Sequence, residues 1–142
     1  MAFKIEDFQT KIDKNESYEL ETRLIEFASR VIDMAEKMPK TFATKHIGSQ
    51  IIRSATSPAL NYGEAQGAES KEDFIHKMKI CLKELRETLI CLKLIEHRGW
   101  FAQGKLSGLI KKNNELVSIF AASAKTATSN PTINPRKSHL KS

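Results

Sequence analysis

The 142-residue sequence has only two cysteines, no long apolar run and no strand-like alternation of apolar and polar residues. Cys81 and Cys91 lie ten residues apart. On one helix this separates their Cα atoms by ~15 Å, beyond the ~7 Å limit of a disulfide, so both are interpreted as buried thiols in a reducing compartment. No apolar run approaches the ~20 residues of a membrane-spanning helix, and the charged N-terminal segment lacks the apolar core of a secretory signal. We expect a cytoplasmic protein with no membrane partner.

Metal-binding and catalytic patterns are also missing from the sequence. The four histidines are scattered at His46, His76, His97 and His139, and none has the spacing of a metal site. The glycines and serines of residues 62–70 do not form a phosphate-binding loop, because no strand precedes them and no G-K-[ST] follows. No nucleophile–base pair is visible. We therefore expect no metal, no cofactor and no catalytic residue, and predict that the protein is not an enzyme.

What the sequence does contain is helical periodicity, with apolar residues recurring at alternating spacings of three and four. The first predicted helix ends at Pro39, the second begins near Thr41 and ends within residues 63–67, and the third begins after the N-cap Ser70 and ends near Gly99. The fourth follows the next connection. The predicted core positions are Leu20, Leu24, Phe27, Val31, Met34 and Met38; Phe42, Ile47, Ile51, Ala55, Ala59 and Tyr62; Ile75, Met78, Leu82, Leu85, Leu89 and Leu92; and Leu106, Ile110, Asn113, Val117, Phe120 and Ala124.

Four helices with short connections predict an all-α fold, an antiparallel up-down-up-down four-helix bundle. The bundle is expected to occupy residues 16–127. Residues 1–15 are polar with scattered apolar residues and are interpreted as an N-terminal arm. Residues 128–142 contain two prolines and no acid, which is typical of an irregular basic tail.

The net charge of +6 is unevenly distributed. Residues 1–38 hold nine acids and six bases (−3), and residues 39–142 hold eight acids and seventeen bases (+9). Four bases share one side of the third helix and form a candidate nucleic-acid-binding stripe: Lys79, Lys83, Arg86 and Lys93. The alternative is an ordinary solvated face.

The third helix also carries apolar residues away from its main stripe: Ile80, Ile90, Cys91 and Leu94. A monomeric bundle has no need of this second patch, so we interpret it as a candidate oligomer interface. The alternative is that the N-terminal arm packs against it.

A polar stripe on the second helix consists of Arg53, Ser57, Asn61 and Glu64, which share one face at spacings of 4, 4 and 3. Arg53 and Glu64 are three turns apart and need partners on another helix or chain. We interpret the stripe as a structural polar network with buried partners that fixes helix register or a subunit interface. A ligand site or active site is the less favoured alternative, because no catalytic pair accompanies the stripe.

The same stretch resembles the signature of the bacterial 23S rRNA intervening-sequence protein family, approximately R-x-x-x-S-I-x-x-N-I-A-E-G followed by S-x-x-D-F. The matching residues are Arg53, Ser57, Asn61, Glu64, Ser70, Asp73 and Phe74, whereas "S-I" is Ser57–Pro58 and "A-E-G" is Gly63–Ala65 here. The resemblance covers about residues 15–125. It implies an antiparallel four-helix bundle that assembles into a ring-like homopentamer. A similar fold serves as the accessory protein of diversity-generating retroelements, where a basic pentamer binds nucleic acid and a reverse transcriptase.

These observations predict a non-enzymatic, self-assembling bundle, preferably a homopentamer, that offers a basic surface to RNA or DNA. The alternative is an oligomeric scaffold for a protein partner with no nucleic-acid role.

Overall fold

The computed structural model describes residues 14–129, and this part of the chain consists of four helices without a strand. They are α2 (Lys14–Glu36), α3 (Phe42–Gln66), α4 (Lys71–Arg98) and α5 (Ser107–Ser129). The all-α prediction with four helices is confirmed. Helix α2 begins two residues before the expected start of the bundle at residue 16, and α5 ends two residues after its expected end at residue 127. The rest of the arm and tail lies outside the described residues.

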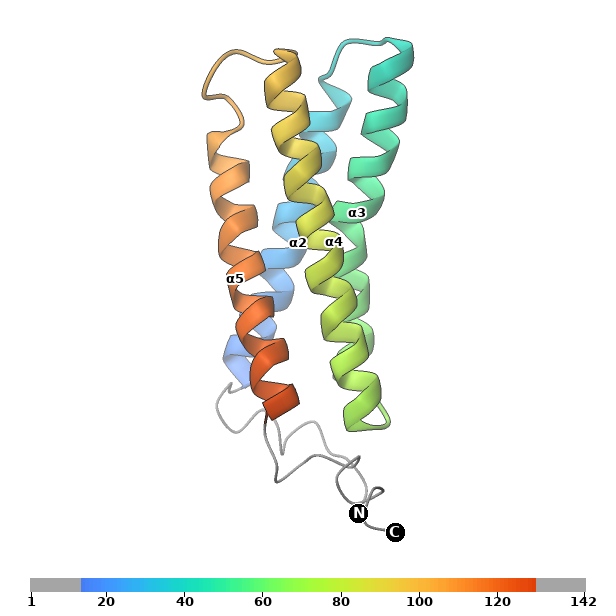
Figure 1. Cartoon of the computed structure of the whole chain (residues 1–142), viewed down its shortest axis with the longest axis vertical. Helices are drawn as coiled ribbons and strands as arrows, with labels where there is room; N and C mark the ends of the chain where they lie inside the picture. The colour runs from blue at the N-terminus through green and yellow to red at the C-terminus, as the bar shows by residue number, and fades with distance from the viewer. Residues whose placement is uncertain (1–13, 130–142) are drawn as a thin grey trace.

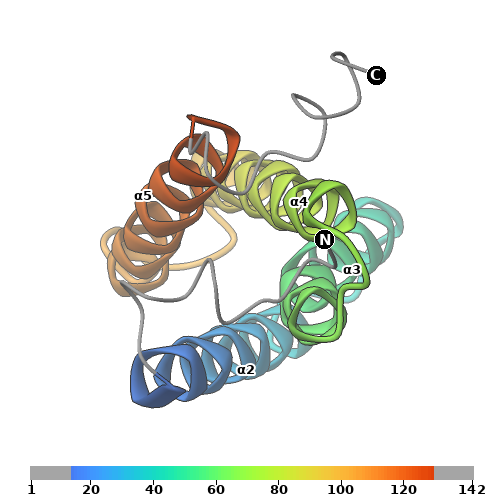
Figure 2. The ribbon, with the colours of Figure 1, turned by 90° about the horizontal axis from the view of Figure 1, so that it is seen from below.

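Successive helices are joined at alternate ends of an elongated molecule (Figure 1). Viewed along the long axis, α2 lies beside α3, α3 beside α4, and α4 beside α5 (Figure 2). The pair α3 and α4 packs most closely, whereas α2 and α5 make the fewest contacts of the four neighbouring pairs. None of the four helices in the described residues has an apolar stretch that would cross a membrane.

The core follows the predicted stripes, because residues three and four apart lie on one face of a helix. Leu24, Phe27, Val31, Ile51, Leu85, Leu92, Leu116 and Phe120 are among its fully buried members. The prediction is wrong for Phe42, which is 92% exposed. Phe42 is the first residue of α3, next to the N-cap, and the helix has no preceding turn that would bring a neighbour over its ring.

Helix ends are fixed by the predicted cap residues. Ser70 accepts a hydrogen bond from the Asp73 amide at the start of α4, and Gly99 ends that helix with a φ of 72°, in the left-handed region that favours glycine. At the start of α3, Thr41 and Thr44 exchange side-chain-to-backbone hydrogen bonds in a capping box. Each bond satisfies an amide that the helix itself leaves without an acceptor.

The core also contains polar contacts. Asn113 on α5 is fully buried. In the side-chain orientation that satisfies both groups, its amide nitrogen donates to the Leu85 carbonyl at 3.0 Å and its amide oxygen accepts from the Leu89 backbone amide at 3.2 Å. Helix α3 is unbroken through the buried Pro58, whose carbonyl accepts a hydrogen bond from the Cys81 thiol on α4 at 3.5 Å. Both contacts tie α4 to a neighbouring helix through groups that would be costly to bury unpaired.

Candidate nucleic-acid interface

Helix α4 buries one side and exposes a broad opposite face. Phe74, Met78, Cys81, Leu85 and Leu92 point into the core. On the exposed side, residues seven apart form parallel rows along the helix, because seven residues are close to two turns. The basic row consists of Lys79, Arg86 and Lys93; the middle row of His76, Lys83, Ile90 and His97; and the third row of Ile80, Glu87 and Leu94.

All four predicted nucleic-acid-binding residues are exposed: Lys79, Lys83, Arg86 and Lys93. Within residues 14–129, none of these four forms an ion pair with an acid, although other bases of the molecule do. Their charges are therefore not neutralised by the described part of the chain. Along the basic row, one cation follows the next about every 10.5 Å by helical rise.

The predicted apolar patch is only partly present at this surface. Ile90 is 63% exposed and Leu94 is 41% exposed, while Ile80 is half-buried. The prediction is wrong for Cys91, which is 8% exposed and belongs to the hydrophobic core. Cys91 lies on the flank of α4 that packs against α3, where burial and, to a lesser degree, the Glu87 carboxylate raise the pKa of its thiol. Ile90 shares the middle row with Lys83, so the predicted basic stripe and apolar patch are one continuous face.

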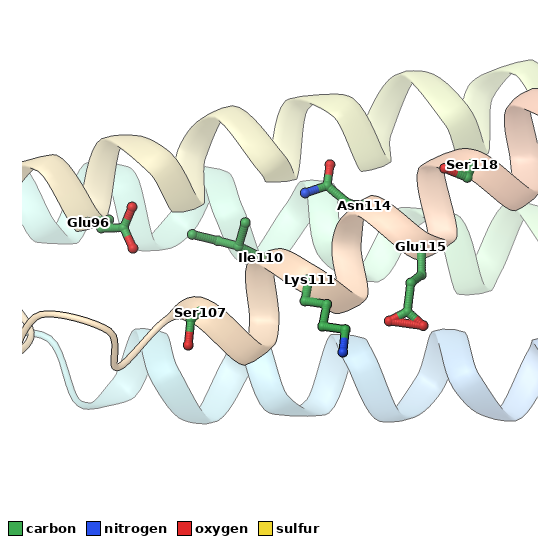
Figure 3. Close-up of a pocket in the computed structure, with 7 residues that line it drawn as sticks. All are labelled: Glu96, Ser107, Ile110, Lys111, Asn114, Glu115 and Ser118. Atoms are coloured by element: carbon green, nitrogen blue, oxygen red, sulfur yellow. The ribbon is translucent and has the colours of Figure 1, made fainter.

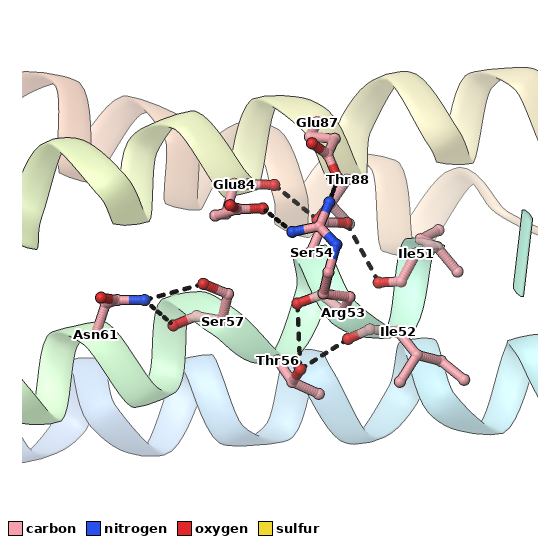
Figure 4. A network of polar contacts seen from close by, with 10 residues as sticks. All are labelled: Ile51, Ile52, Arg53, Ser54, Thr56, Ser57, Asn61, Glu84, Glu87 and Thr88. Atoms are coloured by element: carbon pink, nitrogen blue, oxygen red, sulfur yellow. Dashed lines mark hydrogen bonds and ion pairs between the residues drawn. The ribbon is translucent and has the colours of Figure 1, made fainter. Parts of the chain in front are cut away.

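Arg53 links α3 to α4 through two carboxylates (Figure 4). Its guanidinium donates to Glu84 at 3.1 Å and also to Glu87, one turn further along α4. The hydrogen bond to Glu84 is the largest of the effects that raise the pKa of Arg53. The Glu84 side chain is 11% exposed, whereas that of Arg53 is 54% exposed. The contact therefore satisfies an almost buried carboxylate from the solvent side.

The other members of the predicted network lie apart from Arg53. Asn61 donates to the carbonyl and the hydroxyl of Ser57 on its own helix, at 3.0 and 2.9 Å. Glu64 is exposed and accepts from Lys77 on α4 at 2.8 Å. The four residues do not form one connected network, because the stripe runs along α3 and each turn contacts a different partner, although Arg53 does pair with the buried Glu84. Arg53 and Glu64 do find partners on another helix, as expected.

One buried polar contact between the same helices was missed from the sequence. The Thr88 hydroxyl lies 2.8 Å from the Ser54 hydroxyl and 2.8 Å from the Glu84 carbonyl, and both residues are fully buried (Figure 4). Ser54 in turn donates to the Ile51 carbonyl. A serine next to Ala55 on the core side of α3 was the available signal, but its partner depends on how α4 packs.

A shallow hollow of about 550 Å³ lies along α5 beside the end of α4 (Figure 3). It is lined by Glu96, Ser107, Ile110, Lys111, Asn114, Glu115 and Ser118. Glu115 is paired with Arg23 on α2 at 3.6 Å. The lining mixes two acids with one lysine and contains none of the predicted site residues, so it does not concentrate positive charge for a phosphate.

Metal-ligating side chains and cysteine thiols are the other groups whose chemistry bears comparison with that of the α4 bases. Among residues 14–129, no three histidine, cysteine, aspartate or glutamate side chains gather as metal ligands would. Both cysteines are free and buried, and burial raises the pKa of Cys81 to about 12. A thiol with so high a pKa is a poor nucleophile near neutral pH. The exposed bases of α4 are therefore the feature with the clearest binding chemistry.

Comparison with known proteins adds two findings. A family described as 23S rRNA-intervening sequence protein matches residues 8–122 of this chain, and no curated protein matches it. The fold is similar to the crystal structure, at 1.70 Å, of a protein with unknown function from the S23 ribosomal protein family of Bacteroides thetaiotaomicron VPI-5482. The two chains are 27% identical with a TM-score of 0.69, over 77% of this chain and 97% of the other.

Proposed function

The chain belongs to the 23S rRNA-intervening sequence protein family, and from this premise we propose that it is a non-enzymatic, self-assembling protein that binds RNA or DNA through α4. In this proposal, the antiparallel up-down-up-down bundle assembles into a ring-like homopentamer. The protein acts in the cytoplasm, where its two free thiols stay reduced.

The observation that carries the nucleic-acid proposal is the set of exposed cations on α4 that form no ion pair within residues 14–129. Lys79, Arg86 and Lys93 are exposed in one row, and Lys83 lies beside them. Cations that no acid neutralises attract phosphates, and binding releases the counterions that surround a nucleic acid. Such contacts carry no sequence information, so binding is expected to be only weakly selective for sequence.

Self-assembly supports this function because it multiplies the basic row. Each subunit of a ring presents the same three cations, so weak individual contacts add up through multivalency. Ile90 and Leu94, exposed beside the basic row, supply apolar surface that a second chain can cover.

Binding to fluorescent RNA and DNA duplexes over a salt series tests the proposal. The logarithm of the affinity should fall with the logarithm of the salt concentration at a slope near −0.9 per phosphate neutralised on duplex DNA. The triple variant Lys79→Gln, Arg86→Gln and Lys93→Gln should bind more weakly and show a flatter slope. A matched control removes three other exposed lysines, at Lys45, Lys111 and Lys125, and should keep most of the parent slope.

Two results would contradict the nucleic-acid proposal. If both triple variants bind alike, the row on α4 is a solvated face and binding reflects net charge alone. If the parent binds neither RNA nor DNA at low salt, the alternative function applies, an oligomeric scaffold whose exposed Ile90 and Leu94 contact protein.

A further inference from the structure

A second exposed apolar surface lies on the opposite side of α3, where α2 and α3 pack together. On α2, Tyr18 is 72% exposed and Ile25 is 53% exposed, and Ile32 continues the row at the same spacing of seven. On α3, Leu60 is 67% exposed and Ile52 is half-buried. We define these five residues as the α2–α3 apolar face.

The register of the two helices places these residues at matching heights. The Ser17 hydroxyl lies 3.0 Å from the Tyr62 hydroxyl and donates to Gln66 at 3.1 Å, which aligns the start of α2 with the end of α3. Because the chain runs in opposite directions along the two helices (Figure 1), Tyr18 is level with the turn that contains Leu60. Ile25, two turns further, is level with the region of Ile52. The five residues therefore form one surface rather than scattered exposures.

Gly63 lies on the exposed side of α3 within this surface, and its position leaves room for a side chain. A Cβ atom built at Gly63 would meet nothing within 4 Å, and Gly63 lies in the interior of α3 without a positive φ. Glycine in a helix interior destabilises it by about 0.5–1 kcal/mol relative to alanine. Nothing in the described chain compensates for that cost. A close approach by another molecule at this point would account for the missing side chain.

Charge indicates which molecule approaches. Glu21, Asp33 and Glu36 are exposed on α2, whereas its two arginines are directed towards α5: Arg23 pairs with Glu115, and Arg30 reaches Gly108. The α2 side of the α2–α3 apolar face is therefore bordered by acids, whereas on its α3 side the exposed Lys45 and Arg53 lie seven residues before Ile52 and Leu60. On α4, the exposed Lys83 lies seven residues before Ile90 and forms no ion pair within residues 14–129, and Glu87, seven residues before Leu94, is held by Arg53. The acids of α2 and the free Lys83 of α4 are thus opposite charges beside the two apolar surfaces.

We infer that the α2–α3 apolar face of one copy binds the Ile90–Leu94 surface of a second copy, with the acids of α2 facing Lys83 on α4. This inference rests on the self-assembly proposed above and names its interface. The two surfaces differ and lie on either side of α3, so the contact is head-to-tail and closes into a ring when the rotation between copies permits. Assembly covers Ile90 in the middle row of α4 and Leu94 in the third row. The basic row lies on the other side of the middle row and remains available for phosphate.

Complementary variants test the head-to-tail contact. Leu60→Asp should disable the α2–α3 apolar face, and Ile90→Asp should disable the surface on α4. Each alone should shift the mass measured by light scattering towards the 16.0 kDa monomer. An equal mixture should form a heterodimer of twice 16.0 kDa and nothing larger, because each partner keeps one intact surface. The control Ala122→Asp, exposed on α5, should keep the parent mass.

A second variant separates the interface from folding. Gly63→Gln should lower the mass of the assembly, because its side chain would occupy the contact between copies. The same variant should raise the melting temperature of the isolated subunit, because it replaces a helical glycine where nothing in the subunit would clash with the new side chain. Circular dichroism should confirm that every variant keeps the helical content of the parent.

The outcomes distinguish the two proposals. If the parent is a monomer at all concentrations, self-assembly and this interface both fail. If the parent assembles but Leu60→Asp and Gly63→Gln keep its mass, only the interface inferred here is wrong. If the mixture of Leu60→Asp and Ile90→Asp stays monomeric although each variant is dissociated, the two surfaces do not bind each other.

Discussion

The carboxylate of Glu84 on α4 lies 3.1 Å from the guanidinium of Arg53 on α3, at the edge of the buried contact between these helices. Glu84 is nearly buried, and Glu87 holds the same guanidinium from a more exposed position. The buried Glu84 carboxylate therefore depends on Arg53 for a partner more than Glu87 does, and melting temperatures of variants can measure this difference.

Arg53→Ala should lower the melting temperature by more than Glu87→Ala does. Removal of Arg53 leaves the Glu84 carboxylate almost buried without its cation, whereas Glu87→Ala leaves Arg53 paired with Glu84 and removes only the more exposed contact. Thermal unfolding followed by circular dichroism checks the order of the two variants. Arg53→Lys is the control, since it keeps the charge but loses the two-pronged contact. Equal melting temperatures for the alanine variants would show that Glu84 needs no cation.

Glu64→Ala should leave the melting temperature close to that of the parent. Glu64 is 59% exposed and its partner Lys77 is half-buried, so water reaches the carboxylate and replaces the lost contact, and the ion pair contributes little. The same thermal unfolding experiment at low and high salt is the measurement. A large loss of stability at both salt concentrations would place Glu64 in an interaction beyond the pair with Lys77.

Thr88→Val should destabilise the bundle by ~1–3 kcal/mol, because it buries an apolar group against the Ser54 hydroxyl and removes the hydrogen bond between them. Ser54→Ala should cost less, since the Thr88 hydroxyl keeps the Glu84 carbonyl as an acceptor. Chemical denaturation of both single variants and the double variant gives the coupling energy. A coupling energy of zero would mean that the two hydroxyls do not interact.

Cys81 should resist alkylation in the folded protein. Burial raises the pKa of its thiol to about 12, so at pH 8 the reactive thiolate is about a thousandfold scarcer than at an exposed cysteine. Burial also raises the pKa of Cys91. Labelling with iodoacetamide followed by mass spectrometry should modify both residues only after unfolding. Rapid modification of the native protein at Cys81 would contradict its burial.

The free energy of unfolding should fall as the pH rises above about 9. The Cys81 thiol ionises near its ordinary value of 9.0 in the unfolded chain, but only near 12 in the folded protein. Its contribution is fully present below pH 9 and is lost progressively between these two values, because only the unfolded state releases the proton there. Denaturant titrations from pH 7 to pH 10.5 measure the slope. Cys81→Ala should show a shallower decline than the parent.

The helices and most of the core were predictable from the order of residues. Leu24, Phe27 and Val31 follow a spacing that only a helix can bury on one side, and Ser70 and Gly99 have the local chemistry of helix ends. These features depend on neighbours within a few residues of the chain. The spacing of apolar residues did not predict the burial of two positions, Phe42 at a helix end and Cys91 on the flank of a stripe, because local spacing does not fix burial there.

The sequence alone determined that Arg53, Ser57, Asn61 and Glu64 share a face of α3, and that a row of bases lies on one side of α4. Only the tertiary structure decided their partners. Arg53 meets Glu84 across 31 positions of sequence, and Tyr18 and Leu60 join into one surface, because the packing of whole helices sets the rotation and register that bring distant residues together. A periodic pattern fixes the face that a residue occupies, but the neighbouring helix fixes what that face meets.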